Sequence, residues 1–137
     1  MWDYFLVIAQ GIPTSLSLMA VSLMIAFVLA IIFTFLLSME NKFVKSLVNG
    51  YLMLFTGTPL LVQFFLIYSG PGQFEWLTQS PLWALFSDAW FCAVLALALN
   101  SAAYSTQLFH GAVKAIPKGQ WETCAALGLS RLDTLKI

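Results

Sequence analysis

The chain has 137 residues, of which 61% are hydrophobic and 9% are charged, and its formal net charge is +0. Soluble domains typically contain about 45–50% apolar and about 25% charged residues, so this chain has too few charges to cover a soluble surface. The neutral balance gives no reason to expect nucleic acid as a partner. The composition therefore predicts an integral membrane protein that contacts lipid.

Three long segments without charged residues predict where the chain crosses the membrane. They lie between Asp3 and Glu40, between Lys45 and Glu75, and between Asp88 and Lys114. Each exceeds the roughly 20 residues that a helix needs to cross the hydrocarbon core. The predicted spans are residues 14–37, 47–68 and 90–109.

The first charge-free segment is longer than one span requires, and Gly11-Ile12-Pro13 is the expected position of a helix break. On this interpretation, residues 1–10 form a short interfacial segment that Trp2 and Tyr4 anchor. The N-terminus has no basic segment of the kind that precedes a signal cleavage site, so we expect no cleavable signal sequence.

All six Lys and Arg residues lie in two segments that the positive-inside rule assigns to the cytoplasm. Lys42 and Lys45 lie between the first two predicted spans, and the other four, Lys114, Lys118, Arg131 and Lys136, follow the third. The only charged residues in the N-terminal segment and in residues 70–89 are the acids Asp3, Glu75 and Asp88. We therefore expect the N-terminus to be outside and the C-terminal segment to be cytoplasmic. Cys92 and Cys124 then lie near opposite membrane faces and cannot form a disulfide within one chain.

A break in the helical pattern interrupts the second predicted span. Pro59 has no N–H, so the carbonyl of Phe55 loses its helical partner, and Gly57 loosens the same turn. Two interpretations are open. The break is either an ordinary proline kink that helps helices to pack, or an unwound segment that presents backbone groups to a transported substrate.

A polar stripe follows the third predicted span. Asn100, Tyr104, Gln107 and Gly111 are spaced so that they share one helix face, which we expect to point away from lipid. This face either lines a translocation path or forms hydrogen bonds with a neighbouring helix. His110 lies at the end of the span, where an interfacial or packing role is favoured over ligation. No metal-ligand spacing supports a metal site, and no catalytic pair lies within the spans.

The segment after Pro117 predicts a short helix, a glycine turn and a new helix. Residues 120–127 form the expected helix, with Glu122 in its first turn and Gly128 as the residue that ends it. The following Ser130-Arg131-Leu132-Asp133 has the pattern of a capping box. Such an amphipathic helix either rests on the membrane surface or fills a groove on a soluble partner.

Two motifs in this order resemble a known family. Residues 111–128 resemble the EAA loop of bacterial ABC importer permeases, and more narrowly the AIPxGQxEAAxALG motif of the polar amino-acid uptake family. Residues 55–63 resemble the FRGTPLLVQ motif of the same family, with Thr56 where Arg is usual, and residues 101–104 match its third-span pattern. The arginine-transport branch of this family is the one that three segments resemble most: LFTGTPLLVQ, YSGPGQF and LNSAAYSTQLF.

This resemblance implies an all-α fold like the transmembrane domain of type I ABC importers, and a permease subunit that imports polar amino acids, arginine above all, across the bacterial inner membrane. The implied partners are a second permease subunit, identical or different, a cytoplasmic ABC ATPase dimer and a periplasmic amino-acid-binding protein. ATP is used by the ATPase, and this chain is expected to bind no cofactor and to catalyse no bond chemistry. The coupling loop is expected at residues 111–133, with Gly119, Gln120, Glu122, Ala126 and Gly128 as its ATPase-coupling residues. The candidate substrate path consists of Thr56, Gly57, Thr58, Pro59, Gln63, Asn100, Tyr104 and Gln107.

Departures from the family pattern limit what carries over. Thr123 and Cys124 replace the two alanines of EAA, and both are small enough for docking. Gln107 and His110 stand where Glu and Arg are usual, so no acidic side chain within the spans meets a cationic amino acid. The family implies five spans where three are present, so we expect this sequence to be the N-terminal part of a permease. The alternative function is a non-transporting membrane subunit that only binds a partner permease or the ATPase.

Overall fold

The computed structural model describes residues 2–134, and every regular element in this range is a helix. In chain order these are α1 (Trp2–Ser38), α2 (Lys42–Gly57), α3 (Leu60–Ser69), the 3-10 helix η1 (Pro71–Gln73), α4 (Glu75–Thr78), α5 (Trp83–Phe86), α6 (Ala89–Ala115), α7 (Lys118–Ala126) and α8 (Arg131–Thr134). The expected all-α class is confirmed. Within the described range α1 and α6 are each long and apolar enough to span a membrane, and the bent segment made by α2 and α3 gives a third span if it is counted as one.

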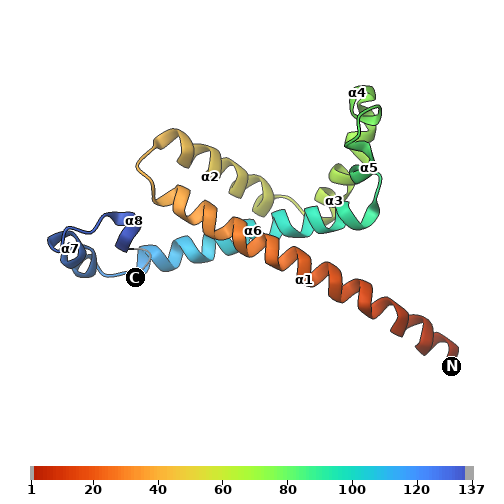
Figure 1. Ribbon diagram of the computed structural model, residues 1–137, viewed down its shortest axis with the longest axis horizontal. Coiled ribbons are helices and arrows are strands. Elements are labelled where there is room, and N and C mark those ends of the chain that lie inside the picture. Colours follow the sequence, from red (N-terminus) through yellow and green to blue (C-terminus); the bar gives the residue numbers. More distant parts are fainter. Residues whose placement is uncertain (1, 135–137) are drawn as a thin grey trace.

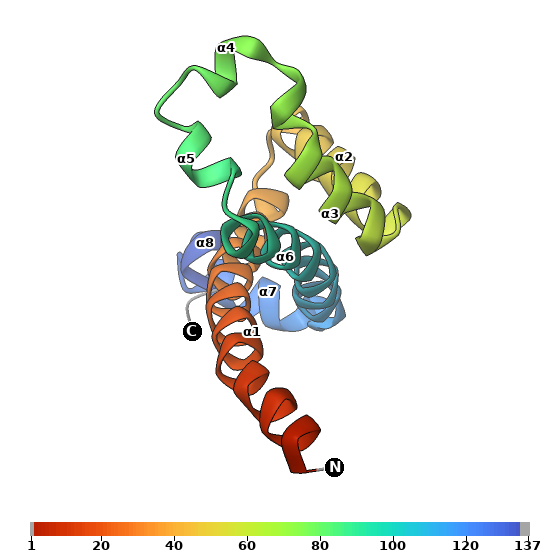
Figure 2. The ribbon, with the colours of Figure 1, turned by 90° about the vertical axis from the view of Figure 1, so that its right-hand side faces the viewer.

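The long helices α1 and α6 cross each other, α3 packs against α6, and α2 contacts both α6 and the end of α1 (Figures 1 and 2). The turn between α1 and α2 lies at the same end of the molecule as α7 and α8 (Figure 1). The N-terminus and the short helices α4 and α5 lie at the opposite end. The segments that the positive-inside rule assigns to one membrane face thus gather at one end. Lys136 and the side chain of Arg131, which belong to the same prediction, lie outside the described part.

Small residues let α1 and α6 approach closely. Four buried residues recur at every fourth position of α1 and form one stripe: Ser22, Ala26, Ala30 and Thr34. The buried face of α6 is equally rich in small residues: Ala96, Ala98, Ala102 and Ala103. The Ser22 hydroxyl donates to the carbonyl of Val94 at 3.5 Å, which links a side chain of α1 to the backbone of α6. Close packing of small residues is a main cause of helix association in lipid, because the hydrophobic effect does not drive helices together there.

The expected helix break at Gly11-Ile12-Pro13 is wrong, because α1 continues through Pro13. The hydroxyl of Ser15 donates to the carbonyl of Gly11 at 3.1 Å, and Ser17 donates to Thr14 at 2.8 Å. These bonds go to carbonyls on either side of Pro13, whereas the carbonyl that the proline deprives of its helical partner is that of Ala9, so they do not replace the missing backbone bond. At 37 residues α1 is about 55 Å long, which exceeds a hydrocarbon core of about 30 Å. The exact limits of the span within α1 therefore stay a prediction, and the predicted anchoring by the Trp2 side chain lies outside the described residues.

A second core joins α1, α2 and α6 near the turn between α1 and α2. Its buried members are Leu37, Val48, Leu52 and Ala103. Tyr51 packs its ring against Phe33 and Phe55, with ring centroids 4.8 Å apart in each pair. The Tyr51 hydroxyl donates to the carbonyl of Leu99 at 2.5 Å, so α2 is fixed to α6 by a polar contact as well as by apolar packing. This core holds α2 in place directly before its break.

Candidate translocation and coupling sites

The second predicted span is broken at Thr58 and Pro59. Helix α2 ends at Gly57, the backbone is extended at Thr58 (φ −112°, ψ 144°) and at Pro59 (φ −62°, ψ 139°), and α3 begins at Leu60. The two helical segments are bent by 108° relative to each other. A bend of this size with two extended residues is larger than an ordinary proline kink. Of the two interpretations that the sequence left open, the unwound segment describes the geometry, while its role in transport stays a prediction.

The carbonyl of Phe55, which Pro59 deprives of its helical partner, accepts two side-chain hydrogen bonds instead. Gln63 Nε2 donates to it at 2.9 Å, and Asn100 Nδ2 on α6 donates at 3.2 Å. The two amides also contact each other, since Asn100 Nδ2 lies 3.1 Å from Gln63 Oε1. Gln63 Nε2 further reaches the carbonyl and the hydroxyl of Thr58 at 3.1 and 2.9 Å. An orphan carbonyl at membrane depth is thereby satisfied.

Gln63 is 4% exposed and is a buried polar side chain of the broken span. Its amide bridges the last turn of α2, the extended residue Thr58 and α6, and so it defines the angle between α2 and α3. The predicted substrate-path residues Gln63 and Asn100 thus meet directly, although they are 37 positions apart. In this structure their contacts are structural hydrogen bonds within the chain.

The polar stripe of α6 divides into two parts along the helix. Asn100 and Tyr104 contact the break, because the Tyr104 hydroxyl donates to the carbonyl of Thr56 at 3.4 Å. The interhelical-hydrogen-bond interpretation is therefore confirmed for these two residues. Tyr104 nevertheless remains 53% exposed, so part of the residue stays accessible. Gln107 and Gly111, one and two turns further on, line a pocket.

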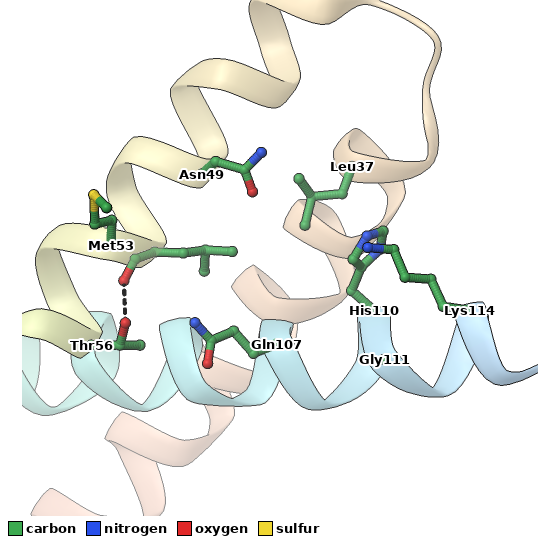
Figure 3. A pocket seen from close by; sticks show the side chains of 9 residues that line it. Leu37, Asn49, Met53, Thr56, Gln107, His110, Gly111 and Lys114 are labelled. Atoms are coloured by element: carbon green, nitrogen blue, oxygen red, sulfur yellow. Dashed lines mark hydrogen bonds between the residues drawn. The ribbon is translucent and has the colours of Figure 1, made fainter.

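This pocket has a volume of about 470 Å³ and lies between the end of α1, the middle of α2 and the second half of α6. Figure 3 shows Asn49 and Thr56 on α2 facing Gln107 and His110 on α6 across it. The Thr56 hydroxyl donates to the carbonyl of Leu52 at 2.7 Å, the bond drawn in Figure 3. Two predicted substrate-path residues, Thr56 and Gln107, therefore line the same pocket. Pockets of this size are in the range that small ligands occupy.

The sequence reasoning did not single out Asn49 or assign His110 to a site. Asn49 is seven residues before Thr56 and therefore on the same face of α2, so a helical-periodicity search around Thr56 would have found it. His110 Nδ1 is buried and has no hydrogen-bond partner among the described residues. Within residues 2–134 there is no group of three or more His, Cys, Asp and Glu side chains arranged to hold a metal. Cys92 and Cys124 are both free thiols, as expected.

The predicted coupling residues lie on and around α7. All five are exposed: Gly119, Gln120, Glu122, Ala126 and Gly128. Trp121 and Ala125 line a second pocket beside α6. Helix α7 thus turns one side toward the membrane helices and leaves most of the coupling residues accessible. Their role in coupling stays a prediction.

Helix α7 ends in a complete Schellman turn. The N–H of Gly128 donates to Ala125 O at 3.0 Å, and the N–H of Leu129 donates to Cys124 O at 3.0 Å. Gly128 has φ +78°, the only positive φ in the described chain, which confirms that a glycine is favoured there. The Ser130 hydroxyl then accepts from the N–H of Asp133 at 3.2 Å, which is the first of the two bonds of a capping box, and donates to the Asp133 carboxylate at 2.5 Å, so Ser130 caps the start of α8. The predicted order of helix, glycine turn and helix is confirmed.

Comparison with known proteins decides the family. Residues 26–136 match the family described as the inner membrane component of binding-protein-dependent transport systems. The chain belongs to this family. Members of this family are described as membrane components of transport systems. The family match covers the broken span, the polar stripe and α7, so all candidate sites lie within it.

Individual relatives are similar over nearly the whole chain. The arginine ABC transporter permease protein ArtM of Haemophilus influenzae is 76% identical over 135 residues, which are 98% of this chain and 60% of that protein. The protein of the same name from Escherichia coli K12 is 56% identical over 138 residues, 100% of this chain and 62% of that protein. The nopaline transport system permease protein NocM of Agrobacterium fabrum is 43% identical over 88% of this chain and 50% of that protein. The chain thus spans about 60% of the length of the first two relatives.

A solved structure supports the fold. The crystal structure of an amino acid ABC transporter with histidines contains a chain that is 28% identical to this one, with a TM-score of 0.80. The match covers 98% of this chain and 59% of that chain. The expected likeness to the transmembrane domain of an ABC importer is therefore confirmed.

Proposed function

We propose that this chain is a permease subunit of an ATP-driven importer for polar amino acids, with arginine as its substrate. The observation that carries this proposal is the 76% identity, over 98% of the chain, to a protein named as an arginine transporter permease. The 28% identical chain from an amino acid ABC transporter is in line with the same substrate class.

The proposed assembly contains a second permease subunit, identical or different, two cytoplasmic ABC ATPases and a periplasmic amino-acid-binding protein. It lies in the bacterial inner membrane, with the N-terminus periplasmic and the C-terminal segment cytoplasmic. ATP binds to and is hydrolysed by the ATPases, so this chain needs no cofactor of its own. Lys42, Lys45, Lys114 and Lys118 support this orientation, because cytoplasmic segments next to spans are rich in Lys and Arg.

The connection between α7 and the break suggests how ATP hydrolysis drives transport. Helix α7 follows α6 after only Ile116 and Pro117, so a force on α7 acts directly on the end of α6. Asn100 and Tyr104 on α6 donate hydrogen bonds to backbone carbonyls at the end of α2. We infer that closure of the ATPases moves α7, that α6 moves with it, and that the broken span then opens to the other side of the membrane.

A cationic amino acid would find few charged partners on this chain. The spans carry no acidic side chain, and the residues in the position for substrate contact are polar: Thr56, Thr58, Asn100, Tyr104 and Gln107. Tyr104, which is partly accessible, is suited to a guanidinium, because cations are attracted to aromatic faces. Carboxylates for the guanidinium would then come from the partner permease subunit.

The test is uptake of radiolabelled arginine by bacterial cells that lack their own arginine import and express this chain together with its second permease subunit, its ATPase and its binding protein. We expect uptake that excess unlabelled arginine suppresses and that an ATPase variant without hydrolysis abolishes. Uptake of a different amino acid in preference to arginine would overturn the substrate. If the ATPase co-purifies with the chain but no uptake occurs, the alternative of a partner-binding, non-transporting subunit is correct.

A further inference from the structure

A second pocket, with a volume of about 780 Å³, lies where the ends of α1 and α6 meet the start of α2 and one side of α7. It adjoins the first pocket, because Asn49, His110 and Lys114 line both. The charges around it are unequal. Lys45, Lys114 and Lys118 line it, whereas Glu122 is the only carboxylate among its described lining residues.

Several hydrogen-bonding groups in this pocket have no partner among residues 2–134. The buried Nδ1 of His110 is unsatisfied among the described residues. Within residues 2–134, the side chains of Lys45, Asn49 and Lys114 also form no hydrogen bond or ion pair. Figure 3 shows the Lys114 side chain beside the His110 ring and the Asn49 amide directed into the space between α1 and α6. Helices α2 and α6 thus present these groups to one space. A buried polar atom without a partner is unfavourable, which here applies to His110 Nδ1, whereas Asn49 and Lys114 are exposed.

We propose that this pocket binds the phosphate of an anionic phospholipid at the membrane face where α7 lies. The ammonium groups of Lys45 and Lys114 neutralise the phosphate, while Asn49 and His110 donate hydrogen bonds to its oxygens. Basic pockets between membrane helices are known to hold lipid head groups in this way. A cation, including a cationic amino acid, is disfavoured by the same excess of Lys.

The surroundings favour a lipid over a soluble phosphate. The apolar side chain of Met53, which lines the adjoining first pocket, is 79% exposed. It provides a surface for an acyl chain, while Trp121 in the pocket wall is a residue type typical of the head-group region. Lipid binding at this site requires only that the pocket lies at a membrane face. The proposal therefore does not depend on the proposed substrate or on the direction of transport.

The experiment measures lipid retention by the full chain in mild detergent, using native mass spectrometry after titration with phosphatidylglycerol or phosphatidylcholine. We expect phosphatidylglycerol to be retained at one site and phosphatidylcholine to be lost. Lys114→Gln should weaken retention about fivefold, the typical effect of one basic residue near the bilayer surface. Lys45→Gln/Lys114→Gln should weaken it further, and Lys114→Arg, which keeps the charge, should retain the lipid. Lys42→Gln is the matched control, because Lys42 carries the same charge on the first turn of α2 but does not line the pocket.

Each other outcome overturns the proposal in a defined way. An equal loss of lipid in Lys42→Gln would mean unspecific attraction of charge. Displacement of the lipid by millimolar inorganic phosphate would assign the pocket to a soluble anion, and displacement by arginine would assign it to the transported substrate. Far-UV circular dichroism of each variant checks that helix content is unchanged. If Lys114→Gln loses both lipid and helix content, His110→Gln is the deciding variant. Unaltered lipid retention by folded His110→Gln would contradict the proposal.

Discussion

At the scale of single residues, the structure depends on how polar groups are satisfied where the second span is broken. The sequence alone predicted that Pro59 leaves the carbonyl of Phe55 without a helical partner. It did not predict which side chains replace that partner, because Gln63 lies beyond the break and Asn100 lies on another helix. Their meeting is a tertiary contact between positions 37 apart, and no local pattern contains it. The sequence nevertheless shows that both residues are polar and lie within predicted spans, which is why both were predicted as site residues.

Replacing Gln63 should destabilise the fold. In Gln63→Leu the carbonyl of Phe55 keeps only Asn100, and the carbonyl of Thr58 loses its side-chain partner. We expect the free energy of unfolding to fall by about 1–3 kcal/mol, the cost of leaving buried polar groups unpaired. Unfolding by SDS, followed by circular dichroism, measures it. The control Gln73→Leu makes the same change at an exposed position and should stay within about 0.5 kcal/mol of the natural chain. Equal stability of both variants would show that the bridge made by Gln63 is dispensable.

Gly57 offers a sharper test of the substrate path than a large substitution would. A Cβ at Gly57 meets nothing within 4 Å in this chain, and the same is true of Gly50 on the same helix. Gly57→Ala should therefore leave the fold intact, and any effect must come from a ligand or from a partner subunit. We expect Gly57→Ala to reduce arginine uptake severalfold at normal expression, whereas Gly50→Ala should not. Normal uptake in Gly57→Ala would remove this glycine from the path.

At the scale of elements, sequence patterns succeeded where a local rule controls the structure. The helix predicted at residues 120–127 is observed as α7, Lys118–Ala126, and the glycine turn and the Ser130 cap follow it. The break expected at Pro13 is wrong, because α1 continues through this residue. Proline in a membrane helix therefore does not fix a break by itself. What distinguishes Pro59 is its setting, in which two amides replace the missing backbone bond.

The end of α7 allows the coupling role to be separated from local strain. Gly128→Asn keeps a residue type that tolerates positive φ, whereas Gly128→Asp adds a charge at the same exposed position. If α7 docks into an ATPase groove, Gly128→Asp should lose most ATPase binding and uptake, and Gly128→Asn should retain most of both. Co-purification of the ATPase and arginine uptake are measured together. Loss of uptake with the ATPase still bound would assign the defect to force transmission, and undiminished binding and uptake in Gly128→Asp would contradict the coupling role.

At the scale of the whole molecule, charge distribution and fold agree. Lys42, Lys45, Lys114 and Lys118 gather at the end that contains α7, and the acids Glu75 and Asp88 belong to the opposite end (Figure 1). The positive-inside rule needs only sequence, so this division was predictable. The 108° bend was not predictable from sequence, because it depends on a tertiary hydrogen bond, in which Asn100 on α6 donates to the free carbonyl of Phe55 on α2. The depth at which each helix meets the membrane surface also depends on partners and lipid, which hydrophobic length alone does not determine.

The orientation can be tested with single cysteines at Ser46 and Ser87, in a chain that carries Cys92→Ala and Cys124→Ala. Both serines are exposed, Ser46 on α2 near the end with α7, and Ser87 just before α6 at the other end. An impermeant maleimide added to intact cells should label the cysteine at 87 and leave the one at 46 unlabelled. Both should react once the cells are opened, which controls for accessibility. Labelling of position 46 alone in intact cells would reverse the orientation, and with it the assignment of α7 to the cytoplasmic ATPase, because a helix on the outer face cannot meet that partner.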